Sequence, residues 1–90
     1  MKKIWYHGTT KVNAKKILKE GFKKGTYFAD HLEDALYYGG NNVFEVRIDF
    51  KFNKGRRYKA FSWQVMCANN ITTDHIIAYK TYKILINPLK

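Results

Sequence analysis

The sequence has 90 residues, a hydrophobic content of 46% and an aromatic content of 17%, which support one small folded domain over residues 1–90 and exclude an intrinsically disordered chain. No apolar run approaches the roughly 20 residues of a membrane-spanning helix, and the N-terminus has no signal-peptide pattern. The single cysteine excludes an internal disulfide bond. We therefore expect a cytoplasmic protein. The 17 Lys and Arg residues against 7 Asp and Glu residues give a net charge of +10, which attracts nucleic acid, an acidic protein face or a dinucleotide pyrophosphate, and equally serves solubility.

The N-terminal third predicts a strand followed by a helix. Residues 3–7 are typical of a short strand that ends at Gly8. Thr10 offers an N-cap and Gly21 a glycine stop, which predicts a helix over 11–20 with its lysines outward. The apolar residues that follow near-helical spacing in this segment are Val12, Ala14, Ile17 and Leu18.

A second strand and helix are predicted next. Residues 26–29 have strand character, and Asp30 with Glu33 three positions later resembles a capping box at a helix start. The glycine pair at 39–40 would end this helix. Its predicted apolar face consists of Leu32, Ala35 and Leu36.

The cleanest pattern in the chain is a strict alternation over residues 44–52. It predicts a long strand with one buried and one charged face. The apolar positions are Phe44, Val46, Ile48, Phe50 and Phe52, and the charged positions between them are Glu45, Arg47, Asp49 and Lys51.

The C-terminal part is less regular. Residues 53–60 indicate a basic turn, residues 61–68 a short helix, and residues 75–79 and 81–86 two β segments that form one bent strand or a hairpin. The fold class predicted from all segments is α+β. No Cys/His cluster has the spacing of zinc ligands, so we expect no metal site.

Two short motifs stand at the ends of the predicted strands. Residues 6–9 read YHGT, and residues 25–30 read GTYFAD, with Tyr38 following Ala29 by nine positions. Together they resemble the first two NAD-binding motifs of the ADP-ribosyltransferase superfamily, in the branch of the poly- and mono-ADP-ribose polymerases. The resemblance is good over residues 4–48 and poor over 71–79. It implies a split β-sheet core with short flanking helices, and NAD as co-substrate.

The resemblance gives the first motif a part in holding NAD. It implies that the His7 side chain bonds a hydroxyl of the adenosine-side ribose, and that the main-chain N–H and C=O of Gly8 pair with the nicotinamide carboxamide, with Thr9 beside them. A glycine suits this place because the ligand must approach the main chain closely. The alternative reading is a histidine and a turn glycine at an ordinary strand-to-helix connection.

The second motif would supply the slot for the nicotinamide ring. By the resemblance, the ring lies between Tyr27 and Tyr38, with Phe28 and Ala29 completing the cofactor-binding motif. Polymerase-like members usually carry a small hydroxyl residue where this chain has Ala35, so one contact to the carboxamide is expected to be missing. The alternative is that both tyrosines are core residues with solvated hydroxyls.

The third motif of the family is a glutamate at the start of a late strand, followed by an apolar, β-branched stretch. Only residues 71–79 have that shape here, and Asp74 is their only acid. The resemblance makes Asp74 the catalytic carboxylate, alongside Tyr38 and His7. It would bond the 2′-hydroxyl of the nicotinamide ribose and stabilise the oxocarbenium-like transition state. The alternative is an ordinary turn carboxylate.

The function implied is that of an NAD-dependent mono-ADP-ribosyltransferase, which moves ADP-ribose to a macromolecular acceptor and releases nicotinamide. The acceptor would be nucleic acid or an acidic protein surface. Similar small transferases occur among bacterial toxins and phage effectors that act in a host cytoplasm. A catalytically degenerate transferase fold that binds a nucleotide or nucleic acid remains open. So does an RNA 2′-phosphotransferase-like enzyme, although those proteins add a basic domain and use active-site arginines.

Overall fold

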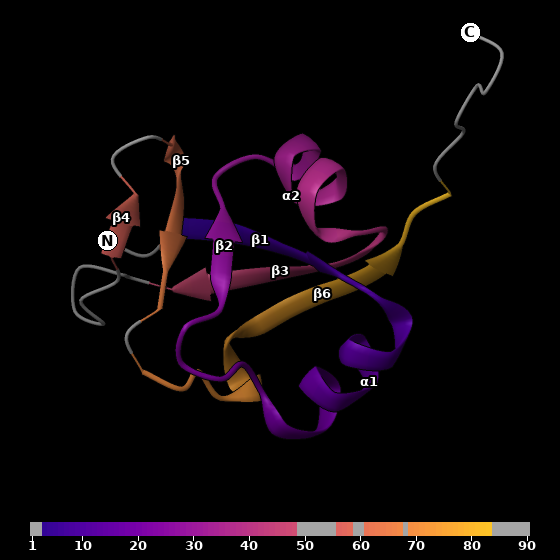
Figure 1. Cartoon of the computed structure of the whole chain (residues 1–90). Helices are drawn as coiled ribbons and strands as arrows, with labels where there is room; N and C mark the ends of the chain where they lie inside the picture. The colour runs from indigo at the N-terminus through magenta and orange to yellow at the C-terminus, as the bar shows by residue number, and fades with distance from the viewer. Residues whose placement is uncertain (1–2, 49–55, 59–60, 68, 84–90) are drawn as a thin grey trace, which may run out of the picture.

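The computed structural model describes residues 3–48, 56–58, 61–67 and 69–83, which form a mixed α+β fold (Figure 1). Six strands make one antiparallel sheet in the order β4-β5-β2-β1-β3-β6. The elements in chain order are β1 (Lys3–Thr9), α1 (Lys11–Glu20), β2 (Tyr27–Ala29), α2 (Leu32–Gly39), β3 (Asn42–Ile48), β4 (Arg56–Tyr58), β5 (Phe61–Met66), the 3-10 turn η1 (Thr73–His75) and β6 (Ile76–Thr81). No helix among these residues has the length and apolar character needed to cross a membrane.

The centre of the sheet is the long pair of β1 and β3, in register from Lys3↔Ile48 to Thr9↔Asn42. The alternation predicted for β3 is confirmed as far as Ile48, because Phe44, Val46 and Ile48 are buried while Arg47 is exposed. The predicted continuation over 49–52 lies outside the described residues.

Helix α1 has the predicted bounds. The Thr10 hydroxyl accepts a hydrogen bond from the Asn13 main-chain N–H at 3.2 Å, and Gly21 ends the helix with φ of +81°. Its lysines are exposed, as expected. The predicted apolar face is only partly right, because Ala14 is fully buried whereas Val12 and Leu18 are 67% and 48% exposed.

Helix α2 packs on β1, β2 and β3. Its predicted apolar face is confirmed, since Ala35 is buried and Leu32 and Leu36 pack with Val43. The predicted capping box is wrong. The helix begins after His31, which makes no side-chain capping hydrogen bond, so Asp30 lies one residue too early to be its N-cap.

The C-terminal predictions need two corrections. Residues 61–66 form strand β5 and no helix; β5 pairs with β2 through Phe28↔Val65. Residues 76–81 form one strand, β6, along β3, which agrees with the single-strand alternative predicted for this segment; residues 84–86 lie outside the described residues. Within the predicted basic turn, residues 56–58 form β4, and the remainder also lies outside the described residues.

Aromatic rings fill the core under the sheet. The rings of Phe22, Phe28 and Phe44 are almost wholly buried, and Phe22 meets the other two edge-on at centroid distances of 5.0 and 5.5 Å. Trp5 is buried with them. Edge-to-face contacts add to the stability that the buried area itself contributes.

Candidate functional site

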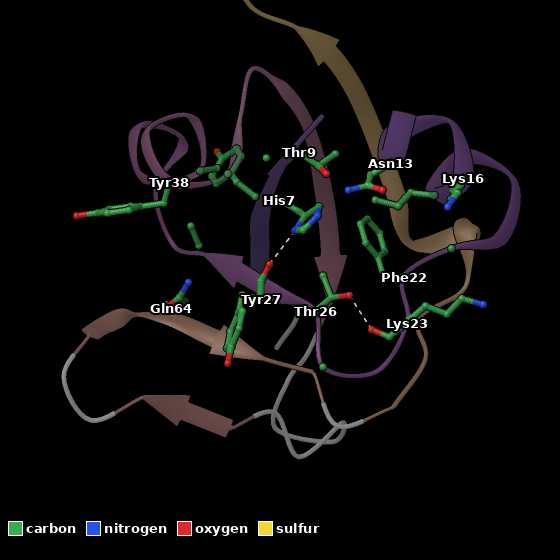
Figure 2. Close-up of a pocket in the computed structure, with 18 of the residues that line it drawn as sticks. His7, Thr9, Asn13, Lys16, Phe22, Lys23, Thr26, Tyr27, Tyr38 and Gln64 are labelled. Carbon is green, nitrogen blue, oxygen red and sulfur yellow. Dashed lines mark hydrogen bonds between the residues drawn. The ribbon is translucent and has the colours of Figure 1, made fainter. Parts of the chain in front are cut away.

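The motif residues meet at a pocket of about 480 Å³, which is within the usual size of small-ligand sites (Figure 2). Its walls come from the end of β1, from β2, from the pocket-facing sides of α1 and α2, and from the loop of residues 21–26. Figure 2 shows His7 near the middle, Lys16 and Lys23 toward one end, and Tyr38 and Gln64 toward the other.

The pocket opens where β1 and β2 separate. The register between these strands is limited to Tyr6↔Ala29, while β1 stays paired with β3 along its whole length. Beyond that point the His7 side chain bridges the two strands, because its Nδ1 lies 2.8 Å from the main-chain oxygen of Tyr27. Where two strands separate in this way, their main-chain N–H and C=O groups become available for hydrogen bonds to a ligand.

The protonation state of His7 follows from this bond. A carbonyl oxygen only accepts, so Nδ1 must carry the hydrogen and the neutral ring has an unprotonated Nε2 that can accept. Burial lowers the pKa of His7, and the hydrogen bond to Tyr27 opposes this only in part. The imidazole is therefore neutral near pH 7.

Aromatic rings hold the imidazole in place. The His7 ring meets Phe22 edge-on at 5.4 Å and Phe28 at 5.6 Å between centroids. Phe28 is 1% exposed and does not line the pocket, so its place is behind His7 in the core and not on the predicted ligand side.

Gly8 is required by the packing of α2. A Cβ atom at Gly8 would overlap the carbonyl oxygen of Ala35 and lie 2.8 Å from that of Gly40. A glycine was predicted here because a ligand would approach the main chain closely. In the structure it is the backbone of α2 that lies close to Gly8 and leaves no room for a side chain. Thr9 and Ala29, which were also predicted to bind the cofactor, line the pocket.

The two tyrosines line the pocket without forming a closed slot. Tyr38 is 63% exposed and packs edge-on against Tyr37 at 4.7 Å. In Figure 2 the Tyr38 ring extends outward from α2 and the Tyr27 ring extends in another direction. A ring bound between them would require the Tyr38 side chain to turn inward, which exposed side chains do within nanoseconds.

Asp74 does not join the other predicted catalytic residues at the pocket. It lies in η1, its side chain is 79% exposed, and its carboxylate accepts a hydrogen bond from the Thr72 hydroxyl and lies 3.7 Å from the His75 imidazole. The strand that follows, β6, is separated from β2 by β3 and β1 in the sheet. The expected convergence of Asp74 with His7 and Tyr38 is therefore not seen.

Gln64, which was not predicted from the sequence, lines the pocket from β5 and is paired in register with Ala29. The signal was present: in FSWQVMC, residues 61–67, apolar side chains alternate with Ser62 and Gln64, which is the period of a strand. Read as a late strand, this segment would have put Gln64 forward as a pocket residue.

Two carboxylates line the described pocket. Glu20 lies at the lysine end, 3.4 Å from the Lys23 ammonium. Asp34 is half-buried on α2, one turn before Tyr38 and therefore on the same helix face. No group of three His, Cys, Asp or Glu side chains suited to a metal ion occurs in the described part of the chain.

The loop wall of the pocket is fastened to the segment 67–71. The Lys24 N–H donates to the Asn70 side-chain oxygen at 2.8 Å, and the main chains of Gly25 and Thr26 exchange hydrogen bonds of 2.9 Å with Cys67. Phe22 pairs with Ile71 in an isolated bridge. The C-terminal segment thus holds the pocket wall in shape.

Comparison with protein-family models and with curated proteins finds no match for this chain.

Proposed function

We propose that this chain is an NAD-dependent mono-ADP-ribosyltransferase with its active site in the pocket between β1, β2 and α2. The observation that carries the proposal is that six residues predicted to hold NAD line one cleft of ligand size, although they come from two motifs about twenty residues apart: His7, Gly8, Thr9, Tyr27, Ala29 and Tyr38. The separation of β1 from β2 after Tyr6↔Ala29 also supports the split sheet that the resemblance implies.

The lysine end of the pocket suits the phosphates of NAD, and His7 suits a ribose. Its unprotonated Nε2 is an acceptor for a ribose hydroxyl, while Nδ1 is already engaged with Tyr27. Lys16 and Lys23 are placed to attract the pyrophosphate. The dinucleotide would then lie with its adenosine part toward α1.

The other end of the pocket suits the nicotinamide ring. The ring is cationic in NAD, and it would meet the face of Tyr38, turned inward, opposite Tyr27. Asp34 lies on the same helix face and brings a negative charge to this end. The charges along the pocket therefore match those of NAD in this orientation.

The reaction needs polar support for the positive charge that develops on the ribose when nicotinamide leaves. We assign this support to Gln64 and Asp34 instead of Asp74. The Gln64 amide can bond a ribose hydroxyl but carries no charge. Asp34 supplies the charge that stabilises the oxocarbenium as the glycosidic bond breaks and its electron pair leaves with neutral nicotinamide. The acceptor then forms a bond to the same carbon and releases its proton to solvent.

Incubation of the protein with NAD labelled in the adenine part, with and without a cell lysate, tests the proposal. Release of free nicotinamide together with label on a macromolecule supports it, and a protein that neither binds nor consumes NAD contradicts it. The controls are a heat-denatured sample and the His7→Ala variant, which lacks the proposed ribose acceptor.

A second candidate function is a degenerate transferase fold that binds a nucleotide without turnover. The neutral Gln64 favours this candidate, because a glutamate at that place would stabilise the transition state better. The Gln64→Glu variant separates the two. If the wild-type protein releases nicotinamide, it is an enzyme. If the wild-type protein binds NAD without releasing nicotinamide and only the Gln64→Glu variant releases it, the protein is the degenerate module.

An RNA 2′-phosphotransferase is less well supported. Such enzymes are expected to use active-site arginines, and the described lining of this pocket contains lysines but no arginine.

A further inference from the structure

We propose that the outward face of α1 binds the phosphate backbone of a single-stranded nucleic acid, which is the macromolecular acceptor. The role as acceptor rests on the proposed function; the binding itself does not. The surface is defined by Lys11, Lys15, Lys16 and Lys19 of α1 and is called the α1 face below.

The lysines of the α1 face are regularly spaced. Lys11, Lys15 and Lys19 follow one another at intervals of four residues, so each lies about 6 Å further along the helix axis than the one before. All three are exposed. This repeat is close to the spacing of successive phosphates in an extended single strand, so one strand can meet several ammonium groups without bending.

The α1 face continues into the pocket. Lys16 is exposed on α1 and lines the pocket, as does Lys23 of the adjoining loop. In Figure 2 both lie toward the same end of the cavity, together with Asn13. A strand bound along α1 would therefore reach the mouth of the pocket without leaving positive surface.

The segment that contains α1 and the adjoining loop is strongly positive. Residues 11–24 contain six lysines and one glutamate, a net charge of +5 out of +10 for the whole chain. Residues 30–38, around α2, contain three acids and no Lys or Arg. A polyanion is thus attracted to the α1 side of the pocket and repelled from the α2 side.

The composition of the α1 face favours a nucleic acid over an acidic protein. Lysine is a mobile point charge that can bind phosphates without the paired geometry of an arginine contact. Val12 and Leu18 are 67% and 48% exposed among the lysines, and they offer apolar contact to the bases or sugars of an unpaired strand. A duplex would present mainly phosphates to the same surface.

The test is the salt dependence of binding to a fluorescein-labelled 20-nucleotide oligo(dT), measured by fluorescence anisotropy without NAD. The variant is Lys15→Ala/Lys19→Ala, two exposed positions that do not line the pocket. The matched control, Arg47→Ala/Lys83→Ala, removes two exposed charges from β3 and from the segment after β6. For single strands each lost phosphate contact lowers the slope of log K against log salt by about 0.7.

We expect the slope of log K against log salt to be smaller by roughly 1.4 in the α1 variant than in wild type. At low salt the affinity of the α1 variant should fall several-fold, while the control should stay close to wild type. Equal losses in both variants, an unchanged α1 variant, or no oligo(dT) binding by wild type would overturn the proposal. So would tighter binding of poly-glutamate than of oligo(dT), which would make an acidic protein the partner. NAD affinity measured separately tests the proposed function, because that function can fail while the α1 face still binds the strand.

Discussion

The Nδ1 atom of His7 lies 2.8 Å from the main-chain oxygen of Tyr27 and joins the two motifs across the gap between β1 and β2. This bond fixes the tautomer, so the free nitrogen of the ring is an acceptor. The neutral ring also stabilises the folded state, because its hydrogen bond to Tyr27 and its packing against Phe22 and Phe28 exist only in the folded protein.

The protein should lose stability as the pH falls below about 6.5, the value of an unperturbed histidine. Burial lowers the pKa of His7 in the folded protein, so His7 of the unfolded chain is protonated first as the pH falls. The contribution of His7 to the free energy of unfolding is complete above about pH 6.5 and is lost progressively as the pH falls toward the lower pKa of the folded state. Thermal unfolding from pH 8 to pH 5 measures the effect. His7→Asn should remove most of the dependence in this window, while His31→Asn, at an exposed histidine, should retain it. Identical profiles for both variants would contradict the assignment to His7.

Tyr38→Ala should weaken NAD binding by roughly 1–3 kcal/mol, the range for stacking of a base on an aromatic ring. The neighbouring Tyr37 offers a matched control, because it is 80% exposed and does not line the pocket. Isothermal titration of NAD into both variants gives the comparison. If Tyr37→Ala lost as much affinity as Tyr38→Ala, the nicotinamide slot would not involve Tyr38 specifically.

Asp34→Asn should slow nicotinamide release by roughly 100-fold, as expected when one stabilising group is removed from a developing charge. NAD affinity should change little by comparison, since the charge on the ribose appears only in the transition state. Glu33→Gln removes the same charge from an exposed neighbour outside the pocket lining and should leave the rate near that of wild type. Steady-state rates and separate binding measurements give the comparison. Equal loss of rate in both variants, or no loss in either, would contradict the role of Asp34.

Gly8→Ala should destabilise the fold by about 1–3 kcal/mol, the usual cost of overpacking, because its methyl group would press against the α2 carbonyls. Gly25→Ala is a useful comparison. Nothing lies within 4 Å of its new methyl group, but its φ of +93° makes any side chain strained. Urea unfolding of the two variants separates packing from backbone strain, and a fully stable Gly8→Ala protein would mean that α2 can move away from β1.

The sequence predicted those parts of the fold whose signals are local. Helix α1 is flanked directly by the capping Thr10 and the terminal Gly21, and β3 has an unbroken alternation from Phe44 to Ile48. Strand β5 was misassigned, because its short apolar segment is compatible with either structure until its pairing with β2 is known.

The same limit explains the site predictions. His7, Gly8 and Tyr27 are close to one another along two neighbouring strands, so a motif found in the sequence corresponds to a real cluster. The resemblance implied Asp74 as the acid, but sequence order does not reveal that β6, which follows Asp74, joins the sheet beside β3 while β5 joins beside β2. Gln64 reaches the pocket through the pairing of β5 with β2, and in the sequence only the strand period of residues 61–67 pointed to it.

The hydrogen bonds that tie residues 24–26 to Cys67 and Asn70 make the affinity of the cleft depend on groups that no ligand touches. A substitution at Asn70 would remove the bond to Lys24 and loosen this loop. If the pocket binds NAD as proposed, selection for tighter or weaker binding can act on Cys67 and Asn70 and leave every contacting side chain as it is.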